Sequence, residues 1–219
     1  MKYASYEFVD KEELIPAIVK VGGASSPVWH QALWSTGEYQ EFVRKNGCGH
    51  CCAAMALNLH GVKIDPHEEF TLCRKLWGEP VREQEFPQGN YQTVTGIAKI
   101  LRHHGVKAEC YGVPDEESAA LRISEALQNG KQVIFWSNPS EDFPDNPFSA
   151  GEHYVMAVGY TEDGQILVAN SSRLRAAKGV QLTDISTITR ALYHGSEPTD
   201  TTWGEKGNHR HCAGFVVVG

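Results

Sequence analysis

The order of elements in this sequence predicts an α+β fold, with helices first and a mostly antiparallel sheet after them. Helical patterns dominate up to about residue 130, and three of them end at a glycine that suits a left-handed helix end. Short apolar runs that are typical of strands follow from Gln132 onward. Two of these runs flank Asp163-Gly164, which is a hairpin signal. The regular alternation of strand and helix in a doubly wound fold is absent.

Length and composition indicate one globular domain over residues 1–219. The chain has 219 residues, 41% of them hydrophobic and 21% charged, so it can bury a sizeable core. We expect a helical lobe over about residues 1–130 and a sheet lobe over about residues 131–219.

The N-terminal segment is predicted to begin with a short helix at residues 11–21. Asp10 would cap this helix, and four apolar residues would form one face: Leu14, Ile15, Ile18 and Val19. Residues 22–35 are expected to form a loop, and residues 38–43 a turn. Four longer helices are then predicted at residues 48–60, 68–77, 93–104 and 115–129, with a loop at residues 78–90 and a short strand at residues 106–111.

The sheet lobe is predicted to hold the remaining strands, at residues 132–136, 154–160, 165–170, 179–182 and 215–218. A helix is expected at residues 184–193, and loops at residues 138–150 and 194–212. Residues 154–160 are apolar on both faces of the predicted strand, so this strand should lie in the centre of the sheet.

Charge and composition also restrict the partners and the location. A net charge of −7 argues against nonspecific binding to nucleic acid or to an anionic membrane. The N-terminus lacks the apolar stretch of a signal peptide, and no apolar run is long enough to span a membrane, so we expect a cytoplasmic protein. We expect the six cysteines to be mostly reduced, and neither a cofactor nor a metal is needed.

Cys48 is the first candidate for a chemical role. It lies between Gly47 and Gly49 and is followed at once by a run of good helix formers. A thiol at a helix N-terminus is favoured as the thiolate by unpaired backbone N–H groups and by the helix dipole. Cys48 is therefore the predicted nucleophile.

His153 and Asn170 are the predicted partners of this nucleophile. His153 begins the central strand, and Asn170 ends the strand that returns from the hairpin. If the loop holds residues 161–164, Asn170 lies opposite Val155, one diagonal step from His153, a gap of roughly 7–8 Å that two side chains can bridge. A two-residue loop would place Asn170 opposite Ala157 and out of reach. Burial should lower the pKa of His153, and a nearby thiolate should raise it again.

The sequence around Cys48 and the sequence around His153 resemble the papain-like cysteine peptidases that trim double-glycine leaders from bacteriocin precursors. Met55, Leu57 and Gly61 stand at the seventh, ninth and thirteenth places after Cys48, where the family has methionine, leucine and glycine. Residues 127–134 resemble the family's helix-glycine-strand segment, and residues 151–160 its catalytic-histidine strand. The resemblance implies a papain-like fold, Cys48 as nucleophile, His153 as base and a peptide or protein as substrate.

The sequence departs from the family at two places. The third triad position is usually aspartate followed by proline, whereas this chain has Asn170-Ser171; papain itself uses asparagine. The family also has an oxyanion glutamine about six residues before the cysteine. Here the nearest is Gln40, eight residues before Cys48, and it is the expected oxyanion donor if a loop two residues longer delivers its amide. Gln31 is a weaker substitute.

Other interpretations stay open. In the papain pattern the second cysteine of the cluster attacks, which would make Cys51 the nucleophile. The chain could hydrolyse an amide or transfer the acyl group to an amine, or it could be a papain-like binding module without catalysis. A zinc protein is a further alternative, with ligands from two groups of residues: Cys48, His50, Cys51 and Cys52, and His209, His211 and Cys212.

Overall fold

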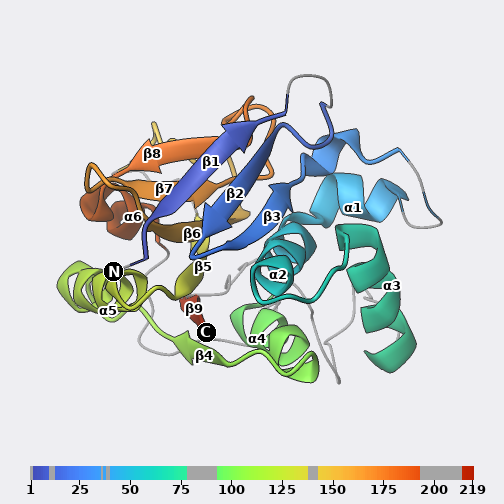
Figure 1. The fold of residues 1–219 in the computed structure, drawn as a ribbon, viewed down its shortest axis with the longest axis horizontal. Helices are drawn as coiled ribbons and strands as arrows, with labels where there is room; N and C mark the ends of the chain where they lie inside the picture. Colours follow the sequence, from blue (N-terminus) through green and yellow to red (C-terminus); the bar gives the residue numbers. More distant parts are fainter. Residues whose placement is uncertain are drawn as a thin grey trace, which may run out of the picture.

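A computed structural model of the chain describes residues 2–9, 13–35, 37, 40–77, 93–137, 143–192 and 214–219. The loops predicted at residues 78–90 and 194–212 lie outside these residues, as does the group of possible zinc ligands at residues 209–212. Within the described part, helices and antiparallel strands are combined in an α+β fold, which confirms the predicted class (Figure 1).

Six strands of the described residues form the central sheet, and each neighbouring pair is antiparallel. In spatial order they are β4 (Ala108–Tyr111), β9 (Phe215–Val218), β5 (Gln132–Ser137), β6 (His153–Tyr160), β7 (Ile166–Ala169) and β8 (Val180–Thr183). β5 is buried throughout and β6 at every residue but the last. The predicted central strand is therefore confirmed.

The longer helices are also confirmed, with small shifts at their ends. They are α2 (Cys48–Leu59), α3 (Pro66–Trp77), α4 (Val94–His103), α5 (Glu116–Gln128) and α6 (Ile185–Ala191). Side-chain oxygens of Thr93 and Asp115 accept backbone N–H groups at the starts of α4 and α5. Three glycines follow the ends of α2, α4 and α5 with φ of 87°, 77° and 73°, namely Gly61, Gly105 and Gly130.

Alternate side chains of the sheet supply two hydrophobic cores. Along β6, Tyr154 and Met156 join the core that contains α2 and α4, whereas Val155 and Ala157 join the core that contains α5 and α6. The sheet is thus the middle layer, with α5 and α6 against one face and α2 and α4 against the other. α2 is buried at every one of its twelve residues.

The N-terminal segment differs from the prediction. Instead of a helix at residues 11–21, it forms a three-stranded antiparallel sheet of β1 (Ala4–Phe8), β2 (Ala17–Val21) and β3 (Ala24–Val28), and β3 packs against α2 (Figure 1). Every second residue of β2 is buried, which is the period of a strand. Gly22 and Gly23 have φ of 55° and 89° and connect β2 to β3 by a two-residue hairpin, a turn signal that the helical interpretation overlooked.

Two further short elements precede the cysteine. A 3₁₀ turn, η1 (Gln31–Leu33), lies where a loop was expected, and the helix α1 (Gln40–Asn46) replaces the expected turn at residues 38–43. α1 ends one residue before Gly47, and α2 begins one residue after it. The cysteine therefore follows a tight helix–helix junction.

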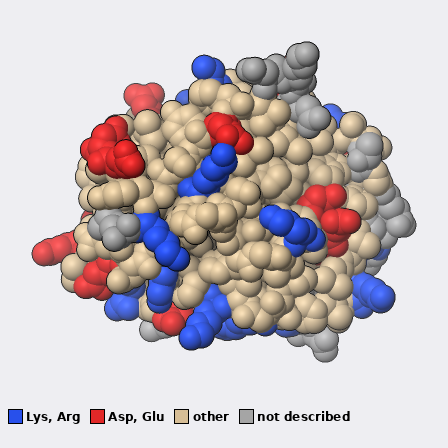
Figure 2. All heavy atoms as spheres, in the orientation of Figure 1, with Lys and Arg blue, Asp and Glu red and all other residues tan. Residues whose placement is uncertain are grey.

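The face of the molecule shown in Figure 2 carries basic and acidic side chains next to one another, without a large patch of one sign. Lys20 and Glu7, for example, form an ion pair of 2.6 Å across β1 and β2. Within the described residues, no helix is both long enough and apolar enough to cross a membrane.

The junction between α1 and α2 leads to the first testable prediction. A Cβ atom at Gly47 would lie 2.4 Å from the carbonyl oxygen of Val43 and 2.8 Å from its Cα, and both are backbone atoms. We expect Gly47→Ala to lower the free energy of unfolding by about 1–3 kcal/mol, the usual cost of overpacking. Urea unfolding measures this loss.

Gly151→Ala is the matched control, because no atom of the described residues lies within 4 Å of a Cβ added at Gly151. We expect this variant to unfold at nearly the wild-type urea concentration. Equal stability of the two variants would show that the junction tolerates a side chain.

Candidate active site

Cys48 is the first residue of α2, with Gly47 as the preceding cap residue. Its side chain is 8% exposed, whereas those of Cys51 and Cys52 are completely buried. α2 packs against β6, the strand that begins at His153. The predicted nucleophile thus lies at the start of a buried helix, where backbone N–H groups favour a thiolate.

His153 and Asn170 are brought together as the hairpin argument predicts. Met156 pairs with Ala169, so Asn170 continues the register opposite Val155, and His153 Nε2 lies 3.0 Å from Asn170 Oδ1. The hairpin reaches this register in a different way from the expected one. Tyr160 pairs with Ile166, which makes the loop one residue longer, and an irregularity between Ala157 and Gly159 restores the register.

The Asn170 side chain is completely buried and makes four hydrogen bonds. Its Oδ1 accepts from His153 Nε2 and from the backbone N–H of Ser172, at 3.0 and 2.9 Å. Its Nδ2 donates to the carbonyl oxygen of Phe148 at 3.0 Å and to Gln181 Oε1 at 2.8 Å. Because the oxygen and the nitrogen each meet complementary partners, the amide has one favourable orientation.

This orientation determines the tautomer of His153. The amide oxygen of Asn170 can only accept a hydrogen bond, so Nε2 of the histidine carries the hydrogen and Nδ1 keeps its lone pair. Burial lowers the pKa of His153 to about 4, while the hydrogen bond to Asn170 raises it. The expected effect of burial is confirmed, and the neutral ring can act as a base through Nδ1.

Ser171, which the sequence pattern does not single out, connects the His153–Asn170 pair to α2 and to η1. Its hydroxyl donates to Gln31 Oε1 at 3.2 Å and lies 3.5 Å from His153 Nε2. It also hydrogen-bonds the thiol of Cys51, one turn along α2 from Cys48. Its position directly after Asn170 was the available signal, whereas no local pattern pointed to Gln181.

Cys51 has the environment of a structural cysteine. Burial raises the pKa of its thiol well above the ordinary value, and the neighbouring Cys48 raises it further, against the lowering effect of the Ser171 hydrogen bond. None of the five described cysteines is in a disulfide.

The two candidate oxyanion glutamines occupy different environments. Gln40 is exposed at the first residue of α1. α1 is seven residues long, so about 10 Å of helix lies between Gln40 and the junction with α2. Gln31 is half-buried, and both its backbone N–H and its side chain hydrogen-bond Ser171.

The chain has a papain-like cysteine peptidase fold. A cysteine lies at the start of a buried helix, and a hydrogen-bonded histidine and asparagine lie on the central sheet. The model of the Peptidase_C39 like family matches residues 27–193, and the chain belongs to this family. The family resemblance drawn from the sequence is thereby confirmed.

Two peptidases are among the solved structures that match the chain. A double glycine motif protease from an AMS/PCAT transporter, in complex with the leader peptide, is 13% identical, with a TM-score of 0.39 over 78% of this chain and 81% of that one. A C39-like peptidase from Bacillus anthracis is 14% identical, with a TM-score of 0.45 over 80% of this chain and 89% of that one. No curated protein sequence is significantly similar to the chain.

The lowered pKa of His153 predicts how stability depends on pH. The unfolded chain binds a proton on this ring near pH 6.5, whereas the folded protein does so only near pH 4. The contribution to stability is therefore complete above about pH 6.5 and is lost as the pH falls toward 4. In a Cys48→Ala background, which removes the thiolate, we expect a loss of about 3 kcal/mol from this group between pH 7 and pH 4.

Urea unfolding across this pH range measures the loss, and Cys48→Ala/His153→Gln is the matched control. The double variant lacks the titrating ring and should lose about 3 kcal/mol less than the single variant over the same interval. Parallel curves for the two proteins would contradict the lowered pKa.

Proposed function

We propose that the chain is a cysteine peptidase that cleaves peptide bonds with Cys48 as nucleophile, His153 as base and Asn170 as the residue that orients His153. The observation that carries this proposal is the hydrogen bond from His153 Nε2 to Asn170 Oδ1, which leaves Nδ1 as the basic atom. Membership of a peptidase family supports a peptide or protein substrate.

In the proposed reaction, Nδ1 of His153 takes the proton of the Cys48 thiol, and the thiolate attacks the carbonyl carbon of the scissile bond. The C–N bond then breaks as Nδ1 gives this proton to the leaving amine. The acyl group remains on Cys48 as a thioester. His153 then takes a proton from water, which attacks the thioester and releases the acid and the thiolate. An amine in place of water would give acyl transfer by the same steps.

Two donors are proposed for the oxyanion, the backbone N–H of Cys48 and the side chain of Gln31. The Gln31 oxygen already accepts from Ser171, so its NH₂ group remains to donate elsewhere. The exposure of Gln40 and its distance along α1 favour Gln31 over the glutamine expected from the sequence.

The choice of Cys48 over Cys51 rests on access and charge. An attacking sulfur must reach a substrate, and Cys48 is the more exposed of the two. The raised pKa of Cys51 keeps that thiol protonated, which makes it a poor nucleophile.

Removal of the nucleophile gives the central test. We expect Cys48→Ala to lower kcat/KM on cleaved peptides by at least about 10³-fold, as for other covalent nucleophiles. Cys51→Ala should retain activity within about tenfold, because the nucleophile and its base remain in place. Digestion of a peptide library followed by mass spectrometry finds a substrate, and its cleavage rate then compares the variants.

The matched outcomes separate the alternatives. Full activity in Cys48→Ala with loss in Cys51→Ala would assign the nucleophile to Cys51. A wild-type chain that binds library peptides without cleaving any would instead be a binding module.

The glutamine assignment is tested by a second pair of variants. We expect Gln31→Ala to lower kcat by about 10²-fold or more with little change in KM, because an oxyanion donor acts on the transition state. Gln40→Ala, on the exposed end of α1, should change kcat by less than about twofold. The reverse pattern in steady-state kinetics would assign the role to Gln40.

A further inference from the structure

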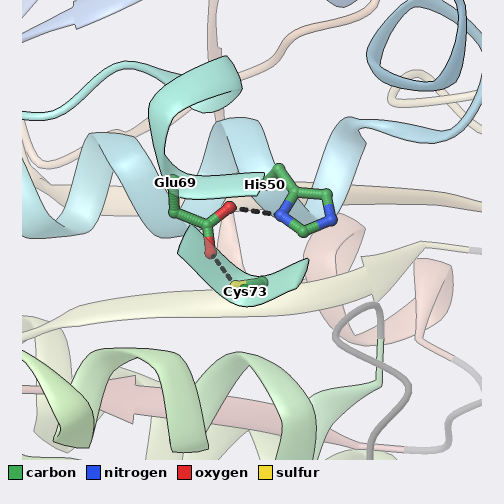
Figure 3. Close-up of side chains that lie close together, drawn as sticks. All are labelled: His50, Glu69 and Cys73. Carbon is green, nitrogen blue, oxygen red and sulfur yellow. Dashed lines mark hydrogen bonds and ion pairs between the residues drawn. The ribbon is translucent and has the colours of Figure 1, made fainter. Parts of the chain in front are cut away.

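A second cluster of ionisable side chains lies between α2 and α3, away from the His153–Asn170 pair. Figure 3 shows His50 of α2 pointing toward Glu69 of α3, with Cys73 on the next turn of α3. The three side chains are 0%, 0% and 1% exposed. His50 Nδ1 hydrogen-bonds Glu69 Oε2, and the Cys73 thiol donates to Glu69 Oε1 at 2.8 Å.

We propose that His50, Glu69 and Cys73 bind one Zn²⁺ ion that joins α2 to α3. Imidazole nitrogen, carboxylate oxygen and thiolate sulfur are the three ligand types of protein-bound zinc. Zinc–ligand bonds of about 2.0–2.3 Å in a tetrahedral arrangement place the ligand atoms of one ion about 3–4 Å from each other, so small side-chain shifts would complete the site. The three donor atoms already lie within 4.8 Å of one another.

The spacing of the ligands suits a helix-borne metal site. Glu69 and Cys73 are four residues apart on α3, so they project from the same face of that helix, as paired metal ligands on a helix do. His50 comes from the neighbouring helix and faces the pair. One ion would therefore replace two side-chain hydrogen bonds by bonds that cross the α2–α3 interface.

Charge balance favours an ion at this place. A carboxylate without water is costly to bury unless its charge is compensated. With Zn²⁺ bound, the charges of the Glu69 carboxylate and the Cys73 thiolate cancel those of the ion, and His50 binds as the neutral ring. Binding releases the thiol proton of Cys73 to solvent, and no oxidation or reduction is involved.

Aromatic rings pack against the histidine of the cluster. The ring of Phe70 lies 4.9 Å from the imidazole of His50, and that of Phe42 lies 6.2 Å away, both edge to face. An apolar shell of this kind strengthens ligand bonds and holds the ring in one orientation. Three protein ligands leave one position of a four-coordinate zinc ion, which a water molecule would fill.

Such an ion would help to fix the orientation of the first turn of α2. His50 is two residues after Cys48, and Cys51 in the same turn hydrogen-bonds Ser171. At 100° per residue, Cys48 and His50 project from opposite sides of the helix. The ion would hold the side of α2 that faces α3, while Cys48 remains on the other. The proposal does not depend on peptidase activity.

Metal analysis of the full chain tests the proposal. We expect about one zinc per chain by elemental analysis after purification without chelators. After chelation and addition of Co²⁺, the wild type should show thiolate-to-cobalt charge-transfer absorption in the near ultraviolet. Cys73→Ser should lose this absorption. Cys110→Ser on β4 and Cys48→Ala should keep it, because neither residue belongs to the cluster.

A second measurement keeps the test valid if Cys73→Ser folds poorly. Glu69→Gln keeps the shape of the side chain, and we expect added Zn²⁺ to raise its melting temperature less than that of the wild type. A wild-type chain that is folded, contains no zinc and shows no cobalt absorption would overturn the proposal. Loss of the absorption in Cys48→Ala, with retention in Cys73→Ser, would also overturn it, because the metal would then lie at the nucleophile.

Discussion

The arrangement of the candidate active site depends on the buried side-chain amide of Asn170. Its oxygen accepts from His153, and its nitrogen donates to the carbonyl of Phe148 and to Gln181, so a flipped amide would set donor against donor and acceptor against acceptor. These hydrogen bonds connect the start of β6 and the end of β7 to β8 and to the segment at residues 147–148. The amide therefore holds the histidine ring, its tautomer and the strands β6, β7 and β8 in one geometry.

Strand register supplies this amide with its partner, and here the sequence predicted the outcome but not the path. An apolar strand that begins at His153, a turn signal and a returning strand that ends at Asn170 are enough to suggest the pairing. The longer loop would have moved Asn170 by one residue, and the irregularity near Val158 restores its position. Gly159 packs within this segment, where a Cβ would lie 3.2 Å from Ala4 Cβ. The irregularity thus lies beside β1, a long-range contact that no local sequence pattern shows.

Elements with local sequence signals could be predicted, whereas features that depend on long-range contacts could not. Helices with polar caps and terminal glycines, such as α4 and α5, were predictable because their signals lie within a few residues. The N-terminal segment was misjudged because Leu14, Ile15, Ile18 and Val19 fit a helical face as well as part of a strand, and Gly22-Gly23 was given no weight. The contact of Ser171 with Gln31 joins residues 140 positions apart, so only the fold reveals it.

α2 contacts both the cluster around Glu69 and the hydrogen-bonded group around Ser171. Its complete burial explains why these polar contacts matter for its orientation. Because all twelve of its residues are buried, an apolar stripe cannot determine which side of the helix faces which neighbour. Polar contacts can: His50 hydrogen-bonds Glu69 on α3, Cys51 hydrogen-bonds Ser171, and Asn58 donates to the carbonyl of Ile64 at 2.7 Å. Rotation of α2 by one residue would turn each group by about 100° and leave it buried without its partner. The rotational setting of α2, and with it the direction of Cys48, is therefore determined by buried polar side chains rather than by hydrophobic packing alone.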